Sequence, residues 1–257
     1  MLDKARMVRA AVTAAAALLA AAGAVARADA EKGTLIEMQA AGENVRAYLV
    51  LPASGAVRGG VVVAHEWWGL NEEIRGVADR LAAEGYATIV PDLYRGVVAA
   101  DPEKAHELMR GLQEGRASAI LRAAASHLKA QEDLAGRKIG VLGFCMGGRL
   151  SLVAALDGKE LSGAVMFYGA PVLEKERLAA LSAPVLGLFG ADDKGIPAAD
   201  VKAFEVAAKA AGKQVETRLY PGAGHAFFNE ARPSYNKEAA QDAWKRTLAF
   251  FESALAK

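Results

Sequence analysis

The chain has 257 residues, with 31 lysines and arginines, 30 aspartates and glutamates, and one cysteine. A composition that is 53% hydrophobic and 24% charged is typical of a soluble globular protein with a sizeable core, and it excludes intrinsic disorder. The formal net charge of +1 argues against a nucleic-acid-binding protein, and the single cysteine excludes an intramolecular disulfide, a four-thiolate zinc site and a CxxC redox pair.

The first thirty residues have the pattern of a secretory signal peptide. Three basic residues precede position 10, residues 10–26 carry no charge, and small-x-small sites follow at 26–28 and 28–30. This pattern predicts export, to the periplasm or out of the cell, and a mature domain at 31–257. Two alternatives stay open: a membrane anchor, disfavoured by the short alanine-rich run, and a translation start placed too far upstream, which implies a cytoplasmic protein. After removal of the leader we expect no stable membrane insertion.

After the leader, apolar runs of strand length alternate with longer amphipathic segments. A hairpin is expected first, with strands at 34–39 and 45–51 around a turn at 41–44. The later strands are expected at 60–65, 87–90, 138–143, 163–168, 184–189 and 214–220. Helices are expected at 72–84, at 102–131 with a break near 111–115, and at 147–156, 173–181, 198–211 and 236–256.

This alternation predicts the fold class. Strands that alternate with helices form a mainly parallel central sheet with helices on both faces, which is an α/β architecture. No linker rich in proline, glycine or serine divides residues 31–257, so we expect a single domain. Ligands of such sheets bind at the carboxyl ends of the strands, and the chemistry is therefore expected just after the apolar runs.

A candidate nucleophile lies at one of these strand ends. Cys145 occupies the centre of a G-x-C-x-G segment, residues 143–147, between an expected strand and an expected helix. This is the nucleophile-elbow pattern with cysteine in place of serine. The positive end of the helix favours a thiolate, and the backbone N–H of Met146 is a candidate oxyanion donor. A buried structural cysteine and a redox-sensing thiol are the alternatives, although no second cysteine is present to resolve an oxidised one.

A nucleophilic cysteine needs a base, and the base needs an acid that orients it. His225 follows the last expected strand in a glycine-rich loop, and Asp192 and Asp193 follow the strand before it. The order of nucleophile, acid and base is that of α/β-hydrolases, with either aspartate as the acid. The other histidines are expected in two solvated helical segments (His106 and His127) and at the end of a strand (His65). No cluster of metal-ligand residues is visible, so neither a metal nor a cofactor is expected.

Five segments together resemble the dienelactone hydrolase family of α/β-hydrolases. They are HEWWGL at 65–70, PDLY at 91–94, GFCMGG at 143–148, the segment 190–197, and GAGHAF at 222–227. The resemblance covers most of the mature chain. It implies an α/β-hydrolase fold and cofactor-free hydrolysis of an enol-lactone ring through a cysteine, histidine and aspartate triad. The G-x-x-D segment, with a proline four positions after the aspartate, indicates Asp193 as the acid rather than Asp192.

The resemblance also implies roles for residues around the triad. The glutamate that corresponds to Glu66 contacts the resting thiol in the family and moves away when substrate binds. A carboxylate beside a thiol disfavours the thiolate by like-charge repulsion, so such a contact would delay activation. The backbone N–H of Trp67 is the second candidate oxyanion donor. Four aromatic residues are candidates for the pocket lining: Trp68, Tyr94, Tyr168 and Phe227.

The sequence departs from the best-known members where two arginines grip the substrate carboxylate. Gly96 and Asn229 occupy these positions, and Arg95 is a candidate substitute for the first arginine. We therefore expect a small-molecule ester or lactone that is less anionic than dienelactone. Alternatives are a general carboxylesterase or thioesterase on the same triad, and a non-catalytic thiol or redox-responsive protein on this fold. A monomer is expected, with a dimer as the alternative.

Overall fold

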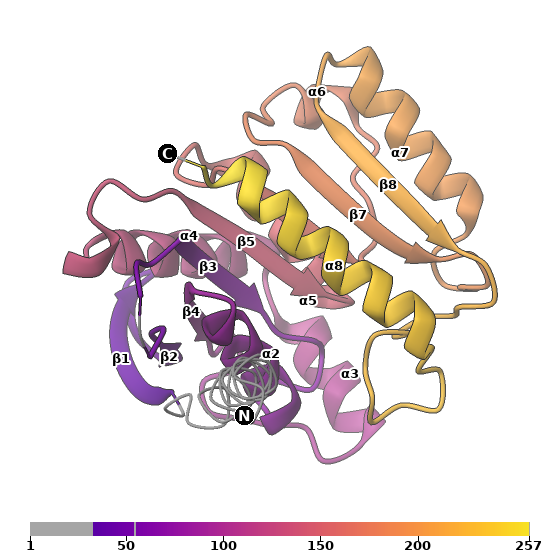
Figure 1. Ribbon diagram of the computed structural model, residues 1–257. Coiled ribbons are helices and arrows are strands. Elements are labelled where there is room, and N and C mark those ends of the chain that lie inside the picture. The colour runs from indigo at the N-terminus through magenta and orange to yellow at the C-terminus, as the bar shows by residue number, and fades with distance from the viewer. Residues whose placement is uncertain (1–32, 54, 257) are drawn as a thin grey trace, which may run out of the picture.

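Eight strands form one twisted sheet that builds the centre of the molecule (Figure 1). The computed structural model describes residues 33–53 and 55–256, so the predicted signal peptide at 1–30 lies outside the described residues and stays a prediction. The strands are β1 Thr34–Ala40, β2 Glu43–Val50, β3 Gly59–Ala64, β4 Tyr86–Pro91, β5 Ile139–Phe144, β6 Ala164–Phe167, β7 Val185–Gly190 and β8 Val215–Tyr220.

The strand order is β1-β2-β4-β3-β5-β6-β7-β8, and every pair from β4 to β8 is parallel. Among the described strands, antiparallel pairing is confined to the opening hairpin, both within itself and against β4. Its turn is shorter than predicted, because Ala41 and Gly42 both adopt positive φ angles, 51° and 79°. Two such residues form the tight two-residue turn that matches strand twist, so β2 begins at Glu43.

The helices occupy both faces of the sheet, as predicted. They are α2 Glu72–Ala83, α3 Pro102–Gly111, α4 Glu114–Lys129, α5 Met146–Asp157, α6 Lys175–Leu178, α7 Ala198–Ala210 and α8 Lys237–Ala254. Alternate residues of β3 show the two layers. Val61 and Val63 pack in the cluster that contains α2 and α8, whereas Val62 and Ala64 pack in the cluster that contains α4, α5 and α7. Each layer has its own buried apolar core.

The predicted helical segment at 102–131 is interrupted where expected. The α3 helix ends at Gly111, Leu112 and Gln113 are extended, and α4 begins at Glu114. A short 3-10 turn at Glu132–Leu134, which the sequence reasoning did not predict, follows α4. The helix expected at 173–181 is reduced to the single turn of α6. None of the described helices combines the length and apolar character needed to cross a bilayer.

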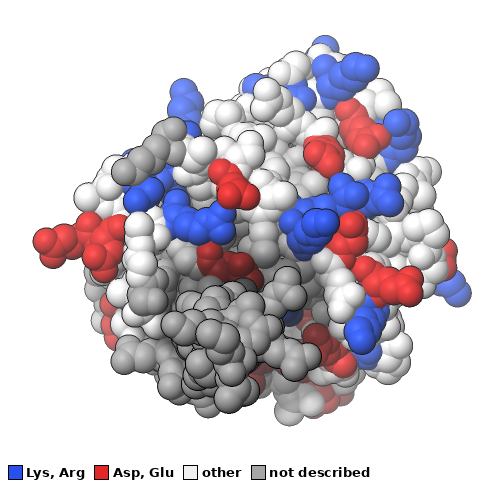
Figure 2. Space-filling view, in the orientation of Figure 1, with Lys and Arg blue, Asp and Glu red and all other residues white. Residues whose placement is uncertain are grey.

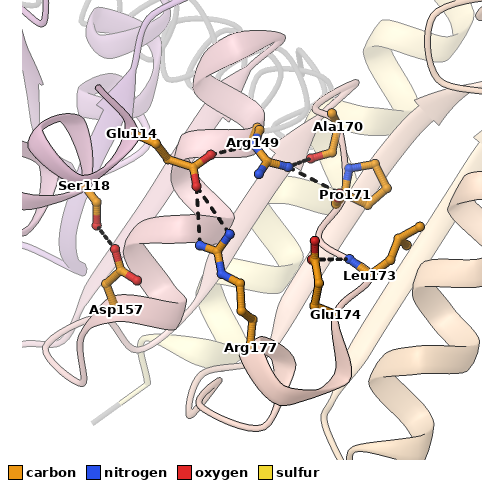
Figure 3. Close-up of polar contacts among 9 residues, drawn as sticks. All are labelled: Glu114, Ser118, Arg149, Asp157, Ala170, Pro171, Leu173, Glu174 and Arg177. Atoms are coloured by element: carbon orange, nitrogen blue, oxygen red, sulfur yellow. Dashed lines mark hydrogen bonds and ion pairs between the residues drawn. The ribbon is translucent and has the colours of Figure 1, made fainter. Parts of the chain in front are cut away.

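A carboxylate at the start of α4 anchors the helix that follows Cys145. Glu114 accepts from Arg149 of α5 at 2.6 Å and pairs with Arg177 of α6 at 3.3 Å (Figure 3). Arg149 also donates to the carbonyl oxygens of Ala170 and Pro171, at 3.5 and 3.4 Å. These partly exposed ion pairs contribute little individually, but together they join α4, α5 and the loop after β6.

The surface charges on the face seen in Figure 2 are mixed in sign. Lysine and arginine side chains lie interspersed with aspartates and glutamates over this face. A face of this kind lacks the single-sign field that attracts a polyanion at a distance. The expectation of no nucleic-acid partner stays a prediction.

Candidate active site

Cys145 lies on a strained turn between β5 and α5. Its φ and ψ angles are 52° and −118°, a combination that L-residues rarely adopt outside functional turns. The flanking glycines are required by contact with backbone. A Cβ at Gly143 would lie 1.9 Å from the carbonyl oxygen of Gly147, and one at Gly147 would lie 2.2 Å from that of Ala64. The G-x-C-x-G segment therefore forms the predicted strand–turn–helix elbow, with Cys145 half-buried.

The structure brings Cys145, His225 and Asp193 into one hydrogen-bonded chain. The Nε2 atom of His225 lies 3.1 Å from the Sγ atom of Cys145, and Nδ1 lies 2.7 Å from Oδ2 of Asp193. Cys145, Asp193 and His225 follow β5, β7 and β8, which are parallel strands, so their carboxyl ends meet at one edge of the sheet.

The choice between the two aspartates is decided by burial and hydrogen bonding. The Asp193 side chain is 1% exposed, and its Oδ1 atom accepts from the backbone N–H groups of Gly195 and Ile196 at 2.8 and 3.1 Å. Asp192 is exposed to solvent. Asp193 is therefore the aspartate that holds His225.

Electrostatics favour an ionised pair within this chain. Burial alone would raise the pKa of Asp193, but the hydrogen bond and charge of His225 and the two backbone N–H groups hold that pKa below its ordinary value. Burial alone would lower the pKa of His225, but the hydrogen bonds and charges of Asp193 and Cys145 raise it to about 10. The imidazolium form of His225 is thus stabilised between its two partners.

This pKa predicts how stability depends on pH. A raised pKa means that His225 contributes stability that is complete below its ordinary value of 6.5 and is lost as the pH rises through about 10. Asp193 has a lowered pKa, so its own contribution does not change over this interval. The Tm advantage of the wild type over His225→Gln, measured by calorimetry, is expected to shrink between pH 6.5 and 10. A constant or growing difference would contradict this assignment.

The comparison with known proteins agrees with this geometry. Residues 45–255 match the family described as "Dienelactone hydrolase family". The chain belongs to the dienelactone hydrolase family. "Protein usf" of Aquifex pyrophilus is 36% identical over 87% of this chain and 99% of its own. A protein of Methylorubrum extorquens named "Putative carboxymethylenebutenolidase" is 35% identical over 80% of this chain and 76% of its own.

A solved structure supports the same assignment. The crystal structure titled "Putative Dienelactone Hydrolase" from Klebsiella pneumoniae has a TM-score of 0.79 and 34% identity, and the match covers 85% of this chain and 97% of that one. The α/β-hydrolase fold predicted from the sequence is confirmed.

Glu66 lies beside the triad, but its oxygens are bound elsewhere. Oε1 accepts from the Tyr168 hydroxyl at 3.3 Å, and Oε2 accepts from the Asn229 amide at 3.0 Å. Burial raises the pKa of Glu66, and the charge of Glu73 acts in the same direction, against the hydrogen bond from Asn229. Among the described residues, the hydrogen-bond partner of the Cys145 thiol is His225. Glu66 therefore does not form the hydrogen bond to the thiol that the resemblance implies, and its Oε2 atom binds Asn229 instead.

The two candidate oxyanion donors lie at the expected strand ends. Met146 is the first residue of α5, where a backbone N–H has no acceptor within the helix. Trp67 follows Glu66 after β3, in the loop from which α/β-hydrolases supply the second donor. Both donor roles stay predictions.

The predicted pocket residues divide into three groups. Tyr168 and Tyr94 adjoin the elbow, since Tyr168 donates to Glu66 and Tyr94 donates to the Met146 sulfur at 3.2 Å. Trp68 is half-buried under the Arg232 guanidinium, which lies 4.1 Å from its ring centroid. Phe227 is fully buried in the α2 and α8 cluster, so it packs in the core.

Neither position 96 nor position 229, nor the neighbouring Arg95, provides a free guanidinium that could bind a substrate carboxylate. Arg95 is exposed and forms an ion pair with Glu43 at 2.8 Å, so its guanidinium is already occupied. Gly96 has no side chain, and Asn229 bridges Glu66 and Glu73, donating to each at 3.0 Å. The two arginines that the resemblance leads us to expect are therefore absent at positions 96 and 229.

Two features escaped the sequence reasoning. His65 is a fully buried structural residue whose Nε2 accepts from the backbone N–H of Leu93 at 3.1 Å, which joins the ends of β3 and β4. A cavity of about 380 Å³ also lies between α2 and the loop 228–231. No periodicity or motif in the sequence marks either feature, because both depend on which loops meet. Among the described residues, no group of His, Cys, Asp and Glu could hold a metal ion.

Proposed function

We propose that this protein hydrolyses a small ester or lactone through a thioester on Cys145. The observation that supports this proposal is the chain of contacts from Cys145 to His225 to Asp193, built on a strained elbow. A binding protein has no need for a positive-φ cysteine hydrogen-bonded to an aspartate-held histidine.

In the first half of the reaction, His225 holds the proton of the Cys145 thiol while the sulfur attacks the carbonyl carbon. The N–H groups of Trp67 and Met146 stabilise the oxyanion that forms. When the C–O bond breaks, the imidazolium of His225 returns the proton to the leaving alkoxide, and the acyl group stays on sulfur as a thioester. In a lactone the leaving oxygen remains attached to the same molecule.

In the second half, neutral His225 removes a proton from water, and the hydroxide attacks the thioester carbonyl. The C–S bond breaks, the carboxylic acid is released, and the proton remains with the Cys145 and His225 pair. Asp193 stays ionised and holds the ring so that Nε2 faces the sulfur. Atoms and charges therefore return to their starting arrangement after one water is consumed.

The absence of arginine at positions 96 and 229 supports a substrate that is less anionic than dienelactone. A bidentate arginine is the geometry that recognises a carboxylate strongly, and an amide does not replace it. The same observation favours a second candidate, a general carboxylesterase or thioesterase on this triad. Both candidates share the thioester, and they differ in the substrate that is preferred.

Trapping the acyl group tests the proposal directly. Wild-type protein mixed with a neutral aryl acetate and quenched in acid is expected to gain the mass of one acetyl group, located on the peptide that contains Cys145. A matched panel of dienelactone and neutral aryl esters is expected to favour the neutral esters in kcat/KM. A thiol that is alkylated by iodoacetamide but forms no acyl adduct and turns over no ester would instead support the redox-responsive alternative.

A further inference from the structure

The cavity between α2 and the loop 228–231 adjoins the triad through three shared residues. Phe144, which lines it, is bonded to Cys145, and Tyr168, which also lines it, has its ring centroid 5.2 Å from that of His225. Glu66 forms the same wall through its hydrogen bond with Tyr168. Cys145 and His225 do not line the cavity themselves, so a group attached at the thiol has to extend past these three residues to reach its space of about 380 Å³. This volume is within the range of small-molecule sites.

Most of the inner surface of the cavity is apolar. Ile74 and Val77 of α2 face it from one side, and Phe144 and Phe228 face it from the other. Ile74, Phe144 and Phe228 are buried, with exposed fractions of 5%, 2% and 6%. The free energy gained on filling such a space comes mainly from removing apolar surface from water.

The charges at the cavity oppose an anionic occupant. Glu66 and Glu73 lie on either side of the Asn229 amide, which donates to both at 3.0 Å. The cation that lines the cavity, Arg80, is held over aromatic rings, with its guanidinium 4.4 Å from the Trp244 ring centroid and 5.5 Å from that of Phe228. Three carboxylates (Glu66, Glu73 and Glu230) and one guanidinium line the cavity, so a carboxylate on the bound group would meet more negative than positive charge.

Gly76 leaves the cavity open on its α2 side, because it has no side chain. It lines the cavity in the middle of α2, and a Cβ built on it would meet nothing within 4 Å. A larger side chain at this position therefore projects into free space and not into the helix or the sheet. Alanine or leucine also favours the helix more than glycine does, so the substitution leaves α2 intact.

We propose that this cavity receives a bulky, uncharged, apolar group of the ester substrate, and that Gly76 sets the size of group accepted. This inference rests on the proposed hydrolytic function and extends it to the substrate class. Either the acyl group or the alcohol group has the required chemistry. Two ester series separate them, one with a lengthening acyl chain on a constant phenol and one with a growing alcohol on constant acetate.

The test compares Gly76→Leu with the wild type on both series. Leucine at this position is expected to lower kcat/KM by about 10-fold or more for the bulkiest ester of one series. One methylene group more or less in a hydrophobic pocket already changes the ratio of kcat/KM between two substrates by about this factor. Hydrolysis of the acetate of the small phenol is expected to stay within about 2-fold of wild type, since its groups do not reach the cavity. Gly76→Ala is expected to give a smaller effect in the same direction.

A matched control is available on another helix. Gly115 lies exposed in α4, and a Cβ there also meets nothing within 4 Å, so Gly115→Leu makes the same chemical change away from the cavity. It is expected to leave the ratio of bulky to small ester unchanged. Circular dichroism and thermal melts of Gly76→Leu and Gly115→Leu are expected to match the wild type.

A second measurement tests the charge of the occupant. An ester with a terminal carboxylate on the bulky group is expected to react more slowly than its methyl ester, and Glu73→Gln is expected to narrow that difference. An unchanged bulky-to-small ratio in Gly76→Leu, with Cys145→Ala inactive, would overturn the cavity inference alone. Small-ester hydrolysis that persists in Cys145→Ala would overturn the proposed function and this inference together.

Discussion

Replacing Cys145 by alanine is expected to lower kcat/KM for a small aryl ester by about 10⁴-fold or more. The variant has no sulfur to form the thioester, so His225 can only direct water at the carbonyl. The oxyanion donors and the binding surface remain, and they account for the residual rate. The measurement is initial-rate hydrolysis of p-nitrophenyl acetate by purified protein, corrected for the uncatalysed reaction.

The Cys145→Ala variant is expected to lose activity but to remain folded. The Sγ atom of Cys145 has one hydrogen bond among the described residues, to His225, and the residue is half-buried. Alanine fits the same backbone, and the Tm is expected to change by a few degrees at most, which follows from a change of about 1 kcal/mol. Undiminished hydrolysis by a folded Cys145→Ala variant would contradict the assignment of the nucleophile.

Cys145→Ser is a more conservative substitution, which replaces the sulfur atom by oxygen. The hydroxyl keeps the position and the hydrogen bond to His225 but is a much weaker nucleophile at neutral pH. Its activity is expected to lie between those of the wild type and Cys145→Ala. An activity equal to that of Cys145→Ala would mean that the site activates a thiol but not a hydroxyl group as the nucleophile.

Replacing Gly143 by alanine is expected to unfold the protein or to lower its free energy of unfolding by about 4 kcal/mol or more. The added Cβ would lie 1.9 Å from the carbonyl oxygen of Gly147 and 2.3 Å from its carbonyl carbon. Both atoms belong to the backbone, so no rotamer change relieves the contact. The first turn of α5 and the end of β5 would have to separate, which breaks the elbow that places Cys145.

The matched control is Gly115→Ala in α4. The same methyl group meets open space there, and alanine is favoured over glycine in a helix by about 0.5–1 kcal/mol. The two identical changes are therefore expected to have opposite signs in a guanidinium unfolding experiment. A stability of Gly143→Ala within about 1 kcal/mol of wild type would show that the elbow adopts another backbone conformation in solution.

Most of the architecture followed from the pattern of apolar residues. The β3, β5 and β7 strands read as unbroken apolar runs because helices cover both faces of the sheet at these positions. The break between α3 and α4 followed from the glycines around it. The length of α6 was overestimated, since the apolar spacing of residues 173–181 is equally compatible with a single helical turn followed by a loop.

The candidate triad was also predictable, for a geometric reason. Parallel strands bring their carboxyl ends to one edge, so a cysteine, an aspartate and a histidine that each follow such a strand converge whatever lies between them. The spacing alone left Asp192 and Asp193 open, and the family pattern favoured Asp193. The structure supports that choice through burial and two backbone N–H groups, which follow from the path of the loop after β7.

The sequence by itself determined the elements, their order, the parallel sheet and the three residues that meet at its edge, because these depend on local periodicity and chain direction. Only the tertiary structure decided that Asn229 binds Glu66 and Glu73, that His65 and Phe227 are buried, and that a cavity opens beside Gly76. These contacts join α2, the end of β3 and the loop after β8, which lie far apart along the chain. The packing of side chains from separate loops has no periodic signal, so it emerges only when the sheet places those loops together.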